Sequence, residues 1–343
     1  MHEPVTTDLD TATGRAPVER RVCVAPMMDW TDRHCRYLHR LFTPHALLYT
    51  EMIVATALVR GNARRLLDHD PFEHPVALQL GGCDPEELAA AARIGVQAGY
   101  AEINLNVGCP SDRVQEGSFG ACLMLRPQQV KECVLGMRAA TQGQVPVTVK
   151  CRIGVDQNDH YEFFAVFAAA MAAAGVDALL VHARAALLGG LTPKENREIP
   201  PLKYDYVRRL KREHPALAVV LNGGLTGCAA IAAHAADLDG VMVGRAAYHR
   251  PELLGELEQA LLDPDWRIPR PWQIIEQMVP YARGQLRQGV RLHSIVRHMH
   301  GLMAGREGAR AWRRFLSDLA GRPDAPPEAL FSALSILEKG AAA

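Results

Sequence analysis

The stretch that decides the fold of this 343-residue chain is Glu102-Ile103-Asn104-Leu105-Asn106-Val107-Gly108-Cys109-Pro110. Apolar Ile103, Leu105 and Val107 alternate with polar residues, which predicts a short strand, and Gly-Cys-Pro then ends it. Cys109 is therefore expected just beyond the C-terminal end of a strand, after two asparagine amides that can bond to a flat heterocycle. A buried turn of small residues would have the same local pattern, so the rest of the chain must decide between the two interpretations.

The pattern of a short strand followed by a helical stretch occurs eight times. Helices are expected over residues 54–67 and 127–141, for example, and Thr31 is expected to cap a helix that runs through Leu41. Eight strand–helix units in one domain predict a (β/α)8 TIM barrel rather than an open sheet. The predicted strands are residues 22–25, 47–49, 76–80, 102–107, 147–152, 178–182, 218–222 and 240–244.

Most predicted strands end in polar residues or glycines, and a barrel brings these ends to one mouth. Lys150 alone could be a lysine that extends to solvent, and His182 alone a hydrogen-bonded core histidine. Glycines after the last two strands let backbone N–H groups approach a phosphate, and Arg245 can bind its oxygens. FMN fits such a mouth, with Lys150 and Gln79 at the polar edges of the ring. No G-x-G-x-x-G follows any strand, which disfavours a Rossmann dinucleotide site.

The composition is that of a soluble globular protein, with 48% hydrophobic residues, 22% charged residues and a formal net charge of zero. Any affinity for nucleic acid must therefore come from a local patch. The eight cysteines form no C-x-x-C pair and no secretory signal is present, so we expect free thiols in the cytoplasm. His298 and His300 lack further ligands at usable spacing, so no metal site is predicted.

The strand–helix rhythm stops near residue 262, where prolines indicate a linker. We predict a disordered tail over residues 1–20, the barrel over residues 21–262 and a helical domain over residues 263–343. Between Arg283 and Arg322 there are nine arginines, two acidic residues and no lysine, a local charge of +7.

An excess that consists only of arginine suits phosphate contacts better than solubility, although a solvated helix face is the alternative. Arg310, Arg313 and Arg314 are expected on one helical segment, with the aromatic Trp312 nearby.

Seven short motifs occur in order along the barrel: VAPMMDWTD (24–32), QLGG (79–82), NLNVGCP (104–110), KCR (150–152), VHAR (181–184), NGG (222–224) and VGR (243–245). Together they closely resemble the tRNA-dihydrouridine synthases over about residues 21–319. The segment GLTPKENREIPPL (190–202) resembles the bacterial subgroup that modifies the D-loop uridines 20 and 20a.

The resemblance implies that the chain reduces the C5=C6 bond of these uridines in tRNA, with FMN as cofactor and NADPH as reductant. Hydride would pass from flavin N5 to C6 of the uracil, and Cys109 matches the residue that gives a proton to C5. A free thiol has a pKa of about 8.5, so it is mostly protonated near neutral pH and can act as this acid. The residues expected to bind FMN are Pro26, Met27, Met28, Gln79, Lys150, His182, Asn222, Gly223, Gly224, Gly244 and Arg245. Those expected to contact the uracil or the tRNA are Asn106, Arg152, Lys194, Arg197, Arg310 and Arg313.

Three alternatives stay open at this point. A flavin barrel that oxidises a free pyrimidine such as dihydroorotate would share the mouth, but it leaves the arginine-rich helical domain unexplained. A tRNA-binding chaperone with a vestigial barrel would be colourless. An aldolase acting on a phosphorylated substrate would use Lys150 as a Schiff-base amine. A monomer is expected because a partner of tRNA size needs the mouth and the helical face free.

Overall fold

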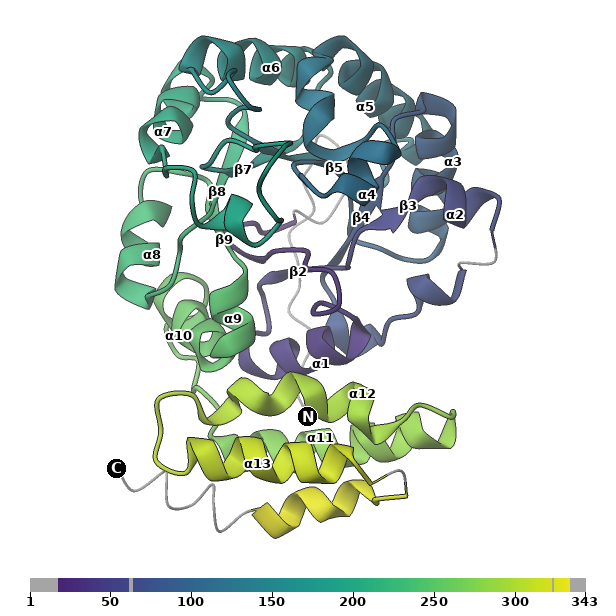
Figure 1. Cartoon of the computed structure of the whole chain (residues 1–343), viewed down its shortest axis with the longest axis vertical. Helices are drawn as coiled ribbons and strands as arrows, with labels where there is room; N and C mark the ends of the chain where they lie inside the picture. Colours follow the sequence, from purple (N-terminus) through teal and green to yellow (C-terminus); the bar gives the residue numbers. More distant parts are fainter. Residues whose placement is uncertain (1–17, 62–63, 323, 334–343) are drawn as a thin grey trace.

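Eight parallel strands close on themselves as a barrel in the computed structural model, which describes residues 18–61, 64–322 and 324–333 (Figure 1). Pairing of β2 with β4 completes the ring, and a short strand, β3 (Ile53–Val54), pairs with the end of β4. The predicted TIM barrel is confirmed. The ring consists of β1 (Val22–Val24), β2 (Leu47–Tyr49), β4 (Val76–Gly81), β5 (Glu102–Val107), β6 (Val147–Arg152), β7 (Ala178–His182), β8 (Ala218–Asn222) and β9 (Gly240–Val243).

Alternate residues of each strand point into the barrel or towards the surrounding helices. On β5, Ile103, Leu105 and Val107 belong to the main hydrophobic core between strands and helices. Burying one such side chain is worth about 1.5–3 kcal/mol, so this outer layer supplies most of the stabilisation. The barrel interior has its own smaller apolar cluster, formed by Cys23, Ala25, Leu47, Tyr49, Ala77, Leu180, Val220 and Met242.

Within the described residues, ten α-helices belong to the barrel domain, and most of them form a ring outside the strands (Figure 1). The predicted helix over residues 54–67 is wrong in extent, because α2 ends at Val59 and a 3-10 turn covers Arg64–Leu67. Gly61 follows the end of α2, and glycine disfavours continuation of a helix. The ten are α1 (Arg33–Phe42), α2 (Ala55–Val59), α3 (Pro85–Gln97), α4 (Asp112–Glu116), α5 (Pro127–Thr141), α6 (Tyr161–Ala173), α7 (Tyr204–Glu213), α8 (Cys228–Ala235), α9 (Arg245–His249) and α10 (Glu252–Leu261).

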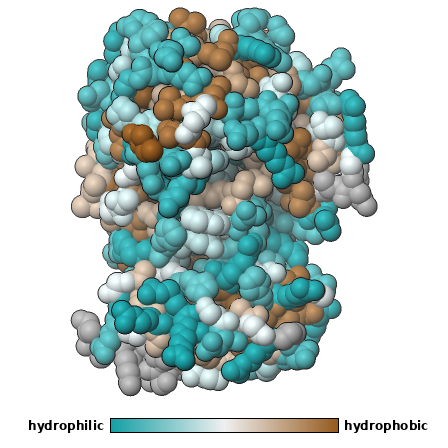
Figure 2. Space-filling view, viewed as in Figure 1, coloured by the Kyte–Doolittle hydropathy of each residue, from teal (hydrophilic) through white to brown (hydrophobic). Residues whose placement is uncertain are grey.

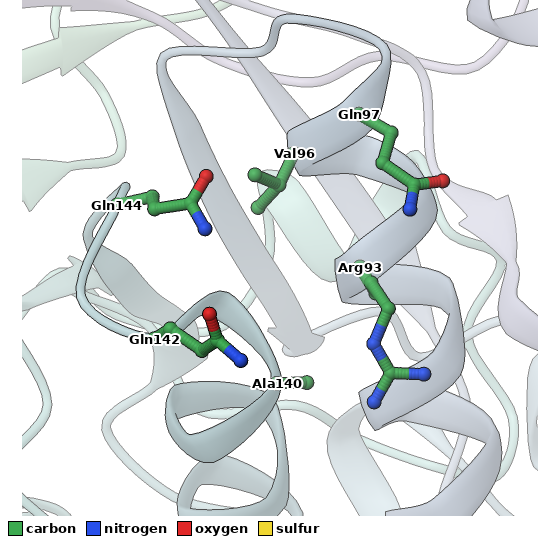
Figure 3. Close-up of a pocket in the computed structure, with 6 residues that line it drawn as sticks. All are labelled: Arg93, Val96, Gln97, Ala140, Gln142 and Gln144. Carbon is green, nitrogen blue, oxygen red and sulfur yellow. The ribbon is translucent and has the colours of Figure 1, made fainter.

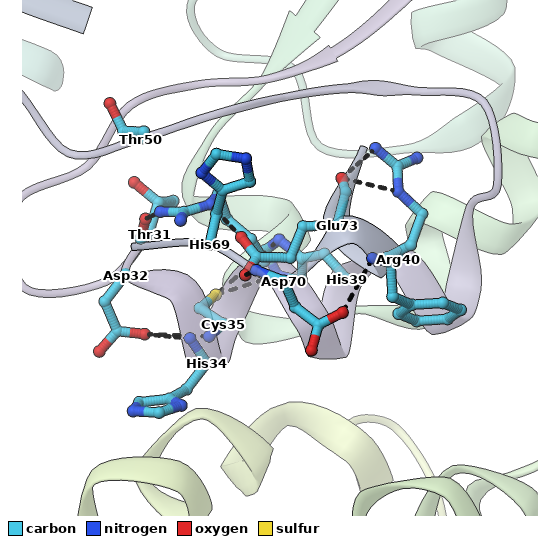
Figure 4. Close-up of polar contacts among 12 residues, drawn as sticks. Thr31, Asp32, His34, Cys35, His39, Arg40, Thr50, His69, Asp70 and Glu73 are labelled. Carbon is cyan, nitrogen blue, oxygen red and sulfur yellow. Dashed lines mark hydrogen bonds and ion pairs between the residues drawn. The ribbon is translucent and has the colours of Figure 1, made fainter. Parts of the chain in front are cut away.

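Asp32, and not Thr31, caps the first helix (Figure 4). The Asp32 carboxylate accepts hydrogen bonds from the backbone N–H groups of His34 (2.9 Å) and Cys35 (3.0 Å). The Thr31 hydroxyl instead accepts from the backbone N–H of Met27 (2.9 Å). The prediction was therefore wrong by one residue, because the Thr31 side chain closes the loop after β1.

Helices alone follow α10 in the described part of the chain. They are α11 (Pro271–Arg287), α12 (Leu292–Val296) and α13 (Ala309–Ala320), with 3-10 turns over Arg297–Met303 and Pro327–Ala333. The predicted boundary after residue 262 falls in the connection between α10 and α11. Figure 1 shows this helical region packed beside the barrel, against α1 and close to α9. No helix of the described residues is long and apolar enough to cross a lipid bilayer.

Asp32 also joins the barrel to the helical region. Its carboxylate pairs with Arg297 Nη2 (2.6 Å) and His298 Nε2 (3.0 Å). Residues 1–17 of the predicted tail lie outside the described residues, whereas Arg20 is placed with its Nε 2.7 Å from Glu102 Oε2. The structure therefore ties the start of the described chain to the barrel interior.

The double role of Asp32 leads to a stability prediction. Burial by itself would raise the pKa of Asp32, but His298, the Cys35 amide and Arg297 together hold it well below its ordinary value. A carboxyl with a lowered pKa stabilises the fold above its unfolded pKa of about 3.9, and this stabilisation is lost as the pH falls below that value. Asp32→Ala should lower the free energy of unfolding by about 1–2 kcal/mol through loss of the cap alone.

Asp32→Asn keeps an acceptor for the helix amides and removes the charge, so it isolates the ion pairs. In urea unfolding, the advantage of the wild type over Asp32→Asn should be full at pH 7 and smaller at pH 3.5. An advantage that does not change with pH would contradict the assigned ion pairs.

Candidate active site

The C-terminal ends of the strands bring most of the predicted site residues to one mouth of the barrel. Lys150 on β6 donates a hydrogen bond from Nζ to Asn222 Oδ1 on β8 (3.1 Å). The Asn222 amide in turn donates to the carbonyl oxygen of Met242 (2.7 Å), which fixes its orientation. His182 on β7 is buried beside Asn222 in the strand register. These three side chains therefore form one polar wall of the mouth.

Burial and neighbouring positive charges set the electrostatics of this wall. Burial, followed by the charge of Arg152, lowers the pKa of Lys150 to about 8. Burial, followed by the charges of Arg152 and Lys150, lowers the pKa of His182 well below its ordinary value, so the imidazole is neutral. His182 Nδ1 is buried and has no hydrogen-bond partner among the described residues. A neutral ring with an unsatisfied nitrogen beside cationic groups suits an anionic ligand rich in polar ring atoms.

Gly223 and Gly224 follow β8 with φ angles of 107° and 70°, which favour glycine. A Cβ atom at Gly224 would lie 2.6 Å from Leu202 and 2.8 Å from the Tyr204 hydroxyl, so no side chain fits there. The Tyr204 hydroxyl donates to the carbonyl oxygen of Gly223 (2.8 Å) and holds this turn. The two glycines therefore fit a tight turn that packs against His182, Leu202 and Tyr204, where other residues would be strained.

Arg245, which follows Gly244 at the end of β9, forms an ion pair with Glu198 (2.5 Å). Both side chains are partly exposed. Glu198 was not among the predicted site residues, because nothing in the sequence shows which charge a loop places beside Arg245. A phosphate at this position would compete with the Glu198 carboxylate for the guanidinium.

Cys109 lies half-buried in a loop whose backbone is held from two directions. The Asn106 Oδ1 atom accepts hydrogen bonds from the backbone N–H groups of Gly108 (3.1 Å) and Cys109 (3.0 Å). Arg152 Nε donates to the carbonyl oxygen of Gly108 (3.1 Å). The thiol donates a hydrogen bond to Ser111 Oγ (3.5 Å). This anchored backbone presents Cys109 at the mouth.

Arg152 and Asn196 connect this loop to the long loop after β7. Arg152 Nη1 donates to the carbonyl oxygens of Ala185 (3.0 Å) and Asn196 (2.8 Å). The fully buried Asn196 side chain accepts from the N–H of Leu187 (2.8 Å) and donates to its carbonyl oxygen (2.9 Å). The predictions did not include Asn196, because bonds between a side chain and distant backbone leave no pattern in the sequence.

The two predicted tRNA contacts on this loop differ in position. Arg197 lies in a short turn (Glu195–Arg197) and contributes, after burial and nearer charges, to the lowered pKa values of Lys150 and His182. Lys194 is exposed at the start of the same turn. Both side chains are exposed, and of the two it is Arg197 whose charge acts on these groups of the mouth.

The predicted arginines of the helical region lie on α13. Arg310, Arg313 and Arg314 are exposed, and among the described residues they form no ion pair. Trp312 lies on the same helix, as expected, but it is fully buried and its Nε1 donates to the carbonyl oxygen of Met299 (2.8 Å), so its ring is not exposed beside these arginines. Positions 312, 316 and 319 form the apolar face of the helix, and the arginines lie away from it. Figure 2 shows hydrophilic side chains over much of this region.

Three other arginines of the basic stretch are paired within the protein. Arg283 pairs with Glu328, Arg297 with Asp32 and Arg306 with Glu252. All three acids lie outside the stretch, so the local charge counted from the sequence overstates the positive charge available to a ligand.

A separate hollow lies between the C-terminal ends of α3 and α5 (Figure 3). These helices run opposite to the strands, so the hollow lies at the end of the barrel away from Cys109. It is lined by Arg93, Val96, Gln97, Ala140, Gln142 and Gln144, and it shares no residue with the mouth. Among residues 18–61, 64–322 and 324–333, no group of three or more His, Cys, Asp or Glu side chains could hold a metal ion.

Known proteins are about half identical to this sequence over most of its length. A tRNA-dihydrouridine(20/20a) synthase of Pasteurella multocida is 51% identical over 317 residues, which cover 92% of this chain and 96% of that protein. A protein of the same name from Xanthomonas axonopodis pv. citri is 53% identical over 327 residues, which cover 94% of this chain and 96% of that protein.

A solved structure of 2-naphthoyl-CoA reductase superposes with a TM-score of 0.54 at 12% sequence identity, covering 70% of this chain and 50% of that one. This likeness supports the fold alone. The sequence model of the family described as Dihydrouridine synthase (Dus) matches residues 23–335. The chain therefore belongs to the dihydrouridine synthase family.

Proposed function

We propose that the chain reduces uridine to dihydrouridine at positions 20 and 20a of the tRNA D-loop, with FMN as bound cofactor and NADPH as reductant. The main observation in support is that the anchored Cys109 loop lies at the same mouth as the wall of Lys150, His182 and Asn222. In addition, the chain is about half identical to proteins named tRNA-dihydrouridine(20/20a) synthase. A tRNA substrate places the reaction in the cytoplasm. We propose a monomer, because a partner of this size needs both the mouth and the helical face.

The residues at the mouth have the chemical groups that an FMN site needs, for the phosphate and for the polar edge of the ring. Backbone N–H groups of Gly223, Gly224 and Gly244, with Arg245, would hold the phosphate. The ring edge would be held by Lys150, Gln79, Asn222 and the unsatisfied His182 Nδ1, and Pro26, Met27 and Met28 would contact the ring from the β1 loop. When bound, FMN supplies the hydride that C6 of the uracil receives.

Cys109 supplies the proton that C5 needs once C6 has been reduced. A cysteine thiol ordinarily keeps its proton near neutral pH, so it can act as a general acid without activation. Asn106 and Arg152 hold the backbone of this loop, and we propose that they also border the uracil. The loop geometry thus keeps the thiol at a fixed position while the base enters.

The target base must leave its stacked position in the tRNA to enter the mouth, which costs a few kcal/mol. Phosphate contacts can offset this cost because they release bound counterions. Arg197 near the mouth, Lys194 on the same loop and Arg310 and Arg313 on α13 provide cations at two separated positions. A free pyrimidine would need no cations on α13, which favours the tRNA over the dihydroorotate alternative.

The role of Cys109 leads to the main test of this function. Purified protein with FMN, NADPH and unmodified tRNA should yield tRNA with two additional hydrogens at each modified uridine, detected by mass spectrometry. Cys109→Ala should slow this reaction by about 10²-fold or more, as is typical for loss of a general acid, while reduction of the flavin by NADPH continues. Cys228→Ala, which changes another half-buried cysteine on α8, is the control and should react at the wild-type rate. Equal rates for Cys109→Ala and the control would exclude Cys109 as the proton donor.

The Arg245–Glu198 pair leads to a second test, on the cofactor. Arg245→Ala removes a phosphate partner, so FMN should dissociate more readily and the melting temperature of the loaded protein should fall with it. Glu198→Gln removes the competing carboxylate and should retain FMN at least as well as the wild type. If both variants keep FMN equally in equilibrium dialysis, the phosphate is held elsewhere.

The exposed α13 arginines lead to a third test, on the tRNA. Arg313→Gln should weaken binding and flatten the plot of log affinity against log salt by up to about one unit, as expected for one phosphate contact. Arg283→Gln is the matched control, because Arg283 is already paired with Glu328. Binding measured at four salt concentrations should separate the two variants. Identical slopes and affinities for wild type and Arg313→Gln would remove α13 from the interface.

A further inference from the structure

A carboxylate lies buried inside the barrel, below the mouth. Glu102 is fully buried, and its Oε2 atom lies 2.7 Å from both Nε and Nη2 of Arg20. Its Oε1 atom accepts hydrogen bonds from the hydroxyls of Tyr49 and Thr148, each at 2.5 Å. A guanidinium and two hydroxyls all donate to this group, so both of its oxygens act as acceptors. Burial and the charge of Glu102 raise the pKa of Tyr49 well above its ordinary value, which keeps that hydroxyl a donor.

A chain of side-chain hydrogen bonds runs from this carboxylate towards the mouth. The Thr148 hydroxyl donates its hydrogen bond to Glu102, and its oxygen accepts one from Asn104 Nδ2 (2.9 Å). Asn104 Oδ1 then accepts from Gln79 Nε2 (2.8 Å), and Gln79 Oε1 accepts from Asn106 Nδ2 (2.9 Å). Every link donates in the same direction. The donor–acceptor sense of each side chain is therefore determined by the one before it.

We infer that Glu102 and Thr148 are positioning residues that set the amide orientation of Gln79 and Asn106 and thereby anchor the Cys109 loop. The chain ends at Asn106 Oδ1, which accepts from the backbone N–H groups of Gly108 and Cys109. If Asn106 were turned over, its NH2 group would face those two donors and the anchor would be lost. The predicted effect on activity rests on the proposed function, whereas the predicted effect on the Cys109 loop does not.

Glu102→Gln tests the direction of the chain. Arg20 can only donate, so the new amide would keep its oxygen towards Arg20 and turn its NH2 group towards Tyr49 and Thr148. The Thr148 proton then loses its acceptor, or the amides above it turn over in sequence. Both outcomes weaken the anchor at Asn106.

Thr148→Val breaks the chain without changing a charge, and Thr148→Ser restores the hydroxyl. Tyr49→Phe is the matched control, because it removes a hydrogen bond to the same carboxylate oxygen but no link of the chain. Thr148→Val also keeps the test possible if Glu102→Gln fails to fold.

The first measurement needs neither cofactor nor tRNA. Amide hydrogen exchange, resolved to Gly108 and Cys109, should be about tenfold faster in Glu102→Gln and Thr148→Val, as expected for loss of one hydrogen bond. Thr148→Ser and Tyr49→Phe should exchange like the wild type. The second measurement is dihydrouridine formation, in which the first two variants should lose kcat and the other two should not.

Unchanged exchange at Gly108 and Cys109 in both Glu102→Gln and Thr148→Val, with only a lower melting temperature, would overturn the inference. So would equal acceleration in Tyr49→Phe, because a general loosening of the interior would then explain all three. A wild-type protein that forms no dihydrouridine would refute the proposed function, while the exchange results would still test the chain of hydrogen bonds.

Discussion

The rest of the structure depends on one constraint, which is that polar groups inside a closed barrel must find partners there. Pairing of β2 with β4 closes the ring and leaves it without a sheet edge. Inward polar side chains therefore lose their hydrogen bonds to water and must form hydrogen bonds to one another. Strand β5 directs Glu102, Asn104 and Asn106 into this space, which an apolar core would not tolerate. These three side chains form hydrogen bonds with Gln79 on β4 and Thr148 on β6. The polar network fills part of the interior, and the smaller apolar cluster occupies the rest.

The barrel could be predicted because its signals are local. Short apolar or β-branched runs, with turn residues after them, located all eight strands of the ring to within about a residue of their observed ends. The mouth could also be predicted, since parallel strands bring their C-terminal ends together whatever the loops do. Features that depend on distant partners could not. Glu198 lies beside Arg245 because of a contact between residues 47 positions apart, which no short sequence window contains. The error at α1 has a different cause, because Thr31 and Asp32 are adjacent and both residue types cap helices.

Charge shows the same limit of local reasoning. The sequence does not distinguish the arginines of the helical region that form ion pairs from those that do not. Arg283, Arg297 and Arg306 pair with acidic residues elsewhere in the protein and stabilise it. Trp312 likewise stands among arginines in the sequence but fills the interior of the helical region. Helical periodicity separates these roles only after the apolar face has been identified. An arginine is therefore a candidate for phosphate binding only when its neighbours in space are known.

The contact between Asp32 and Arg297 spans 265 positions of the chain, and this separation has a consequence for synthesis on the ribosome. The nascent chain carries the β1 strand, with β2 as its one available strand partner, and the Asp32 helix for most of translation, since β9 must emerge before the ring can close. The helical region emerges last and covers an already closed ring. Closure of the ring is thus delayed by topology until β9 is available, and the early strands keep unpaired edges until then.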